Sequence, residues 1–226
     1  MRLAAKALLG GIVVGAAALS VYALGVRPWQ LHWGAGAAEA ARALPGDDLV
    51  PSPTLSTTRA ITIHARPDQI WPWLLQIGYG RGGFYSYDSL ERIAGLRGIV
   101  SAERIVPEWQ QVAAGNTIQI SPVTPMDVAV CDPGRALVLH TVLNPLTAEV
   151  AAPRAGGPYL DWSWAFLLEP IDAATTRLII RVRGYYQPRW LAPLFYAAVE
   201  PAHFIMERKM LLGLKQRAEA PALEGA

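Results

Sequence analysis

The pattern of hydrophobic and polar positions begins with an apolar run near the N-terminus. Residues 7–24 contain no charged side chain, a length near the lower limit for a helix that crosses a bilayer. Arg2 and Lys6 precede this run, and Arg27 with Trp29 follows it, as is common beside a membrane span. We therefore predict a single-pass anchor over residues 1–27 with the following domain outside the cytoplasm; a cleaved signal peptide is the alternative.

The remainder of the chain divides into a connection, a folded body and a short tail. Residues 28–56 combine an alanine-rich stretch with several prolines, which is typical of a linker that holds one short helix. Residues 57–219 carry the regular hydrophobic patterns and are predicted to form one domain. Residues 220–226 are predicted to be a disordered tail.

Alternation of apolar and polar residues predicts six strands in the body. They are expected at Thr57–Ala65, Thr117–Ser121, Met126–Cys131, Ala136–Leu143, Asp161–Glu169 and Thr176–Tyr186. In the last strand, the apolar face is opposed by Arg177, Arg181 and Arg183, which we interpret as a solvated face. An antiparallel sheet with one dry and one wet side follows from this alternation.

Three helices are expected around these strands. Pro67 opens the first, and Ser86 is expected to cap a second at Tyr87–Ala94, on which Asp88 and Arg92 would form a surface pair. The third spans Trp190–Glu219 and is apolar around much of its circumference, so it is buried on more than one side or contacts a ligand, membrane or partner. The charged run Glu207, Arg208 and Lys209 is interpreted as a solvated stripe on this helix. The order of elements predicts an α+β fold in which a curved antiparallel sheet surrounds the long C-terminal helix.

Composition narrows the classes of function. The formal net charge is +2, and apart from Arg2 and Lys6 the chain has 18 basic and 18 acidic residues, which argues against nucleic acid as a partner. Cys131 is the only cysteine, so no intrachain disulfide can form. The four histidines have no ligand spacing, and neither a metal nor another cofactor is expected.

The run from Ile77 to Arg92, IGYGRGGFYSYDSLER, is the richest in chemically usable side chains. Its glycines resemble a nucleotide-binding loop, but they follow a helix where the dinucleotide motif follows a strand. We interpret them as a flexible link between two helices that needs positive φ at several positions. Tyr79 and Arg81 are expected either at the mouth of a cavity or exposed to solvent. Asp88 is either a general base or, more simply, a residue that stabilises the helix dipole.

Four strings carry a resemblance to a known superfamily. They are LPGDDLVPSPTLSTTRAITIHA (Leu44 to Ala65), WPWLLQIGYGRGGFYSYDSLER (Trp71 to Arg92), DWSWAFLLEP (Asp161 to Pro170) and MERKMLLGLK (Met206 to Lys215). Together with the order of elements, they resemble an uncharacterised bacterial branch of the START/Bet v 1-like (SRPBCC) superfamily over about residues 30–219. This resemblance implies a helix-grip fold with an internal cavity. It implies no single activity, because the superfamily includes lipid-transfer proteins, metabolite binders and polyketide cyclases, and no catalytic residue is carried over.

The leading hypothesis is a membrane-tethered protein that binds or transfers a lipid or other hydrophobic small molecule, without catalysis. The expected ligand-binding residues are Trp73, Tyr79, Arg81, Tyr85, Tyr87, His140, Trp162, Trp164, Phe166, Ile180, Met206 and Met210. The alternative is a cyclase- or dehydratase-like enzyme that uses Tyr and Asp or His inside the cavity. It requires hydrogen-bonding reach, inside the pocket, between two or more of a set of six residues, which are Tyr79, Tyr85, Tyr87, Asp88, His64 and His140. A third interpretation is an interaction module that docks a membrane protein through its long helix.

Overall fold

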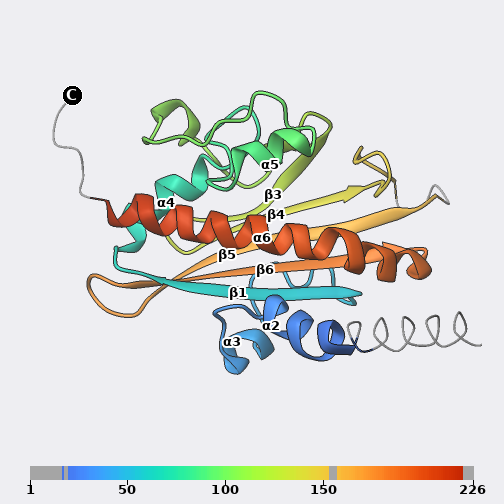
Figure 1. Ribbon diagram of the computed structural model, residues 1–226. Coiled ribbons are helices and arrows are strands. Elements are labelled where there is room, and N and C mark those ends of the chain that lie inside the picture. Colours follow the sequence, from blue (N-terminus) through green and yellow to red (C-terminus); the bar gives the residue numbers. More distant parts are fainter. Residues whose placement is uncertain (1–16, 18–19, 153–156, 221–226) are drawn as a thin grey trace, which may run out of the picture.

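A six-stranded antiparallel sheet forms the centre of the molecule, with the strand order β1-β6-β5-β4-β3-β2 (Figure 1). The strands are β1 (Leu55–Ile63), β2 (Thr117–Ser121), β3 (Thr124–Asp132), β4 (Ala136–Leu143), β5 (Tyr159–Pro170) and β6 (Thr176–Gln187). The structure is a computed structural model and describes residue 17, residues 20–152 and residues 157–220. Strands β2 to β6 follow one another as a meander, and β1 lies beside β6, so the first and last strands of the chain are neighbours.

Helices lie on both sides of this sheet. The α-helices are α2 (Arg27–Leu31), α3 (Ala37–Ala41), α4 (Pro67–Leu75), α5 (Asp88–Ile93) and α6 (Ala192–Glu219). Short turns of other helix types are η1 (Tyr22–Val26), η2 (Pro107–Trp109) and η3 (Arg189–Leu191). The long α6 runs across one face of the sheet, and α2 and α3 lie on the other side of β1 (Figure 1). The expected α+β fold, with a curved six-stranded sheet and a long C-terminal helix, is confirmed.

The main hydrophobic core lies between the sheet and the helices α4 and α6. Strand alternation places Trp164 and Phe166 of β5 and Ile180 of β6 on the inner face. Leu211 and Leu214 of α6 pack against that face and are fully buried. The inner surface of the sheet is therefore covered by α6 along much of its length, which places any internal space between these two layers.

The predicted anchor lies largely outside the described residues. Among those that are described, no helix combines the length and the apolar character needed to cross a bilayer. Residues 28–56, expected as a linker, contain α3 and all of α2 except its first residue. Gln30 of α2 bonds to Arg59 of β1 and Glu200 of α6, and the later part of the segment packs against the outer face of the sheet. There Leu44 forms a small core with Ala60 and Ile179.

The arginine-rich face of β6 is not solvated, contrary to the prediction. Arg181 is 3% exposed and pairs with Asp47 at 2.7 Å (Nη1 to Oδ2), while Arg183 lies 3.2 Å from the other carboxylate oxygen of Asp47. Arg177 forms a 2.7 Å ion pair with Glu39. The segment that precedes β1 supplies both acids, so these arginines attach it to the sheet.

Three local predictions around α5 and α6 are also wrong. Ser86 does not cap α5, because its hydroxyl donates a hydrogen bond to the Met206 carbonyl at 2.8 Å. Asp88 does not pair with Arg92 but accepts hydrogen bonds from the backbone and the hydroxyl of Ser101. Glu207 is not solvated; it is 3% exposed within the core. Each of these side chains has a partner distant in sequence, which a local pattern does not reveal.

The glycine-rich loop is a closed structure and not a flexible link. Gly78 and Gly83 form a β-bridge with two backbone hydrogen bonds of 3.0 and 3.1 Å. The expectation of positive φ is met at Gly78, Gly80 and Gly83. This loop joins α4 to the segment before α5 and lies outside any βαβ unit, so it has no nucleotide-binding geometry.

Candidate functional site

Two cavities lie between the inner face of the sheet and α6. The first has a volume of about 120 Å³ and the second a volume of about 180 Å³. Trp162 of β5 and His203 of α6 line both, so the cavities are neighbours separated by these two side chains. Their ring centroids lie 6.4 Å apart in an edge-to-face arrangement. This pair of cavities is the candidate functional site.

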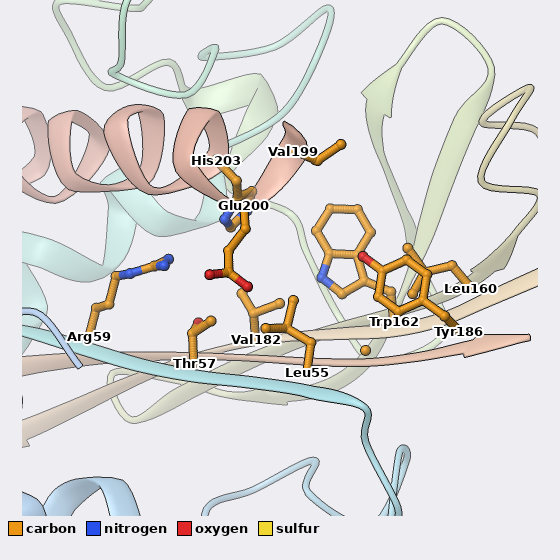
Figure 2. A pocket seen from close by; sticks show the side chains of 11 residues that line it. Leu55, Thr57, Arg59, Leu160, Trp162, Val182, Tyr186, Val199, Glu200 and His203 are labelled. Atoms are coloured by element: carbon orange, nitrogen blue, oxygen red, sulfur yellow. The ribbon is translucent and has the colours of Figure 1, made fainter. Parts of the chain in front are cut away.

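The first cavity is apolar at one end and polar at the other. Figure 2 shows Trp162, Tyr186 and Leu160 on one side, and Arg59 with Thr57 on the other. Thr57 and Arg59 alternate with outward-facing residues along β1, so both side chains point toward α6. The cavity can thus hold an apolar body at one end and a polar group at the other.

Arg59 is the central residue of the polar end. Its side chain is fully buried, and its Nη1 forms an ion pair with Glu207 of α6. Its Nε donates to the Gln30 carbonyl at 2.8 Å, and Trp164 Nε1 donates to the second oxygen of Glu207 at 3.1 Å. The guanidinium also lies 5.2 Å from the centroid of the Phe204 ring. Removing one partner of such a buried pair costs about 3–5 kcal/mol, so the pair fixes α6 on the sheet.

Two buried polar atoms at this end have no protein partner. Among the described residues, neither Arg59 Nη2 nor the Thr57 hydroxyl forms a hydrogen bond. Thr57 is 2% exposed and Arg59 is 0% exposed. Leaving a buried polar group unpaired costs about 1–3 kcal/mol, so these two atoms form a place where a bound acceptor would be favoured.

The charges around the first cavity cancel. Glu200, which hangs from α6 into the cavity in Figure 2, accepts hydrogen bonds from Gln30 at 2.8 Å and Arg27 at 3.0 Å. The Arg27–Glu200 and Arg59–Glu207 pairs therefore leave no net charge. A neutral polar group suits this balance better than an ion, because a buried ion needs a counter-charge.

His203 lies at the junction of the two cavities. Burial lowers the pKa of its imidazole; the carboxylates of Glu207 and Glu200 oppose this shift and the guanidinium of Arg59 adds to it. Its ring has no hydrogen-bond partner within the described part of the chain. A neutral imidazole can donate one hydrogen bond and accept another, so His203 can contact a ligand from either cavity.

The second cavity has aromatic walls and one free carboxyl group. Phe84, Trp162 and Trp164 form part of its lining, which also includes Glu91 of α5, whose carboxylate oxygens have no hydrogen-bond partner among the described residues. Burial, followed by repulsion from Asp88, raises the pKa of Glu91 to about 7. At neutral pH this group is therefore divided between its acidic and ionised forms.

The residues predicted from the sequence are distributed over several places. Those that line the cavities are Trp162, Trp164, Met206 and Met210. Phe166 and Ile180 are fully buried core residues. Trp73, Tyr85 and Tyr87 border a separate surface groove beside α5 and the end of α6.

The side chains of the remaining predicted residues form contacts outside both cavities. Tyr79 donates to the Arg97 carbonyl at 3.0 Å, and Arg81 donates to the carbonyls of Leu75 and Trp109 at 2.9 and 2.6 Å. These two side chains therefore stabilise loops and do not lie at the mouth of either cavity. His140 forms a 2.7 Å contact with Asp161, on the outer face of the sheet.

Of the groups required for the predicted enzyme, Tyr85, Tyr87 and Asp88 border the same surface groove, but among the described residues no two of these groups are joined by a hydrogen bond. His140 lies on the outer face, His64 is exposed at the end of β1, and Asp88 is bonded to Ser101. Burial raises the pKa of Tyr85, whose hydroxyl donates to the Trp73 carbonyl at 2.9 Å. These groups do not form one acid–base site. In the described ranges there is also no cluster of three His, Cys, Asp or Glu side chains placed to bind a metal.

The sequence interpretation missed the polar residues of the site, which are Thr57, Arg59, Glu91, Glu200, His203 and Glu207. A signal existed for Arg59, because it shares strand parity with Ile61 and Ile63 and is thus a cation on an apolar face. Glu207 likewise sits among apolar residues of the C-terminal helix. A charged residue in such a position is seldom buried without a partner, so the two together predict an internal ion pair.

The comparisons with known proteins show that this chain is similar to some solved structures in the general arrangement of its elements only. No family model and no curated protein matches the chain. Among solved structures, the Zhui aromatase/cyclase from Streptomyces sp. R1128 is 15% identical over 76% of this chain and 99% of its own, with a TM-score of 0.39. A truncated norcoclaurine synthase from Thalictrum flavum is 10% identical over 76% and 95%, with a TM-score of 0.40. A protein from Nitrosospira multiformis is 11% identical over 74% and 97%, with a TM-score of 0.44. At these sequence identities and TM-scores, the similarity assigns no activity and no ligand to this chain.

Proposed function

We propose that this protein is a START/Bet v 1-like binding protein that holds a small hydrophobic molecule with a neutral polar end in the first cavity. The observation that carries the proposal is that two buried atoms of the residues at the polar end of this cavity, Arg59 Nη2 and Thr57 Oγ1, have no hydrogen-bond partner among the described residues. A carbonyl oxygen accepts hydrogen bonds from both atoms, and a hydroxyl group does the same. The apolar remainder of the ligand would contact Leu160, Val182 and Tyr186.

Size and charge define the ligand further. An engineered cavity of roughly 150 Å³ binds benzene, so a space of about 120 Å³ suits one six-membered ring or a short chain. Because the two ion pairs already cancel, a carboxylate would introduce an unbalanced buried charge. We therefore expect a ketone or an alcohol to bind more tightly than an acid of the same shape.

Replacing Thr57 by valine tests this proposal. The full-length chain is titrated with cyclohexanone, cyclohexanol and cyclohexanecarboxylate, and binding is followed by saturation-transfer NMR. The wild type is expected to prefer the ketone and the alcohol. Thr57→Val should weaken their binding about 3- to 10-fold, because one neutral hydrogen bond contributes about 0.5–1.5 kcal/mol. The fold should be unaffected, since the Thr57 hydroxyl has no partner among the described residues.

Thr58→Val is the matched control. The Thr58 hydroxyl faces the other side of the sheet and accepts a 3.0 Å hydrogen bond from Arg181 Nε. This variant should lose stability but keep its affinity for the ketone. Equal binding of ketone and carboxylate, or unchanged binding by Thr57→Val, would refute the proposal.

We also infer that residues 7–24 tether this domain to a membrane, with the domain outside the cytoplasm. The support is the run of eighteen residues without charge, flanked by Arg2 and Lys6. The full chain should stay in the membrane fraction after alkaline carbonate washing, and a form beginning at residue 28 should be released. Release of the full chain would contradict the tether.

A further inference from the structure

Glu91 presents a carboxyl group to the second cavity without a protein partner. The residue is 0% exposed, and neither of its carboxylate oxygens forms a hydrogen bond within the described residues. Glu91 is also one of the residues that line the second cavity. A buried polar group that faces a cavity and lacks a partner indicates a position for a complementary ligand atom.

The charges around Glu91 leave its own charge without compensation. The titratable and charged groups that face it are Asp88 and Arg92 on α5, and His203 and Glu207 on α6. Asp88 and Arg92 act in opposite directions, and Glu207 is neutralised by Arg59. The lining residues from β2 and β5 carry no charge, and burial keeps His203 neutral by lowering its pKa. An ionised Glu91 therefore calls for one positive charge from a ligand.

The walls of the second cavity suit an organic cation. Phe84, Trp162 and Trp164 surround the space with aromatic rings, whose faces attract cations electrostatically. Met206 and Met210 provide an adaptable apolar surface on the side of α6. Together, one carboxylate and several aromatic rings match an ammonium group attached to a hydrophobic body.

We propose that the second cavity is a binding site for a small hydrophobic amine, with Glu91 as the counter-ion of its ammonium group. A neutral alcohol could hydrogen-bond to Glu91 but would leave the carboxylate charge uncompensated. A volume of about 180 Å³ accommodates a benzene-sized ring with one extra methylene and an amino group. This site shares Trp162 and His203 with the first cavity but relies on a different polar group, Glu91, which does not line the first cavity.

Benzylamine and benzyl alcohol form a matched pair of probes for isothermal titration calorimetry on the full-length chain. The wild type should bind the amine more tightly than the alcohol. Glu91→Gln should weaken amine binding about tenfold or more, because a charge-assisted hydrogen bond is lost, and should leave alcohol binding nearly unchanged. Glu103→Gln removes an exposed carboxylate outside the cavity and serves as the control. Circular dichroism melting of each variant establishes that it is folded.

Proton release gives a second measurement that a structural role of Glu91 would not produce. At about pH 6 the Glu91 carboxyl is largely protonated, and an ammonium ligand favours its ionised form. Amine binding should therefore release protons, detected as a binding heat that varies with the ionisation enthalpy of the buffer. Glu91→Gln should show no such release. Equal affinity for amine and alcohol in the wild type, or unchanged amine affinity in Glu91→Gln, would overturn the proposal.

The experiments can refute either ligand proposal without refuting the other. Thr57→Val changes a residue of the first cavity only, so it should not affect benzylamine binding. Loss of cyclohexanone binding with intact benzylamine binding would support both sites. Benzylamine binding that depends on Thr57 and not on Glu91 would place the amine in the first cavity and contradict this inference.

Discussion

Arg59 shows how one residue determines both packing and chemistry at the site. It occupies an inward position of β1, where its neighbours of the same parity are Thr57 and Ile61. Glu207 of α6 neutralises its charge through Nη1, and Nη2 has no hydrogen-bond partner among the described residues. The same side chain thus holds the helix on the sheet and supplies a hydrogen-bond donor for a ligand.

Ionisation of the buried Glu91 carboxyl lowers the stability of the folded protein, so this stability depends on pH. Its pKa is about 7 in the folded protein and 4.5 as an ordinary carboxyl, so the folded state binds the proton more tightly. Stability from this group is present below about pH 4.5 and is lost as the pH rises through 7. Between these limits we expect the wild type to lose about 3 kcal/mol of unfolding free energy relative to Glu91→Gln.

Urea unfolding followed by circular dichroism measures this difference at about pH 5 and pH 8. His203 has a lowered pKa and changes stability in the opposite direction, but it is present in both proteins and cancels in the comparison. If the unfolding free energies of the wild type and of Glu91→Gln ran parallel across this pH range, Glu91 would not have a raised pKa.

At the scale of elements, the sequence predicted the strands well. The bounds of β2 and β4 agree with the prediction, and β5 and β6 differ from it by one or two residues at their ends. Alternation succeeds here because one face of the sheet is buried under α6, and a slip of one residue would expose that face. The alternating pattern thus records which face meets α6, but it does not show that the opposite face of β6 is buried as well.

The loops and the site were predictable only in part. Aromatic walls such as Trp162 and Trp164 follow from strand parity, which places them on the inner face. The positions of Arg81 and Tyr85 do not follow from the pattern, because their side chains bond to the backbone carbonyls of Trp109 and Trp73, which are distant from them in sequence. Gly213 is similar: a Cβ there would lie 2.2 Å from the Tyr85 carbonyl oxygen, a close approach that the helix pattern alone does not show.

At the scale of the whole molecule, the segment before β1 is part of the fold. It covers the outer face of β1 and β6, where Asp47 and Glu39 meet the arginines of β6. This sheet is therefore covered on both sides near β1 and β6, by α6 on the inner face and by residues of this segment on the outer face (Figure 1). Both cavities lie on the inner face. The part of the segment that holds Glu39 and Asp47 stabilises the outer face, whereas Gln30, earlier in the segment, contacts Arg59 and Glu200 of the first cavity.

Asp47→Asn tests this division between the two faces. The Asp47 carboxylate accepts hydrogen bonds from Arg181 and from the Leu44 backbone, and it also pairs with Arg183. Its removal leaves the buried Arg181 guanidinium without its counter-charge, which in a fully buried pair costs about 3–5 kcal/mol. Because the Asp47 side chain is 19% exposed, we expect a smaller loss of about 2 kcal/mol in urea unfolding.

Asp48→Asn is the neighbouring control, because Asp48 is exposed and should change stability by less than about 0.5 kcal/mol. Cyclohexanone and benzylamine should bind Asp47→Asn with wild-type affinity, since both cavities lie on the other face of the sheet. A variant that kept full stability would show that the Arg181–Asp47 pair does not attach the segment. A variant that lost ligand affinity while remaining folded would show that the outer segment shapes the cavities as well, and that the two faces of the sheet are coupled.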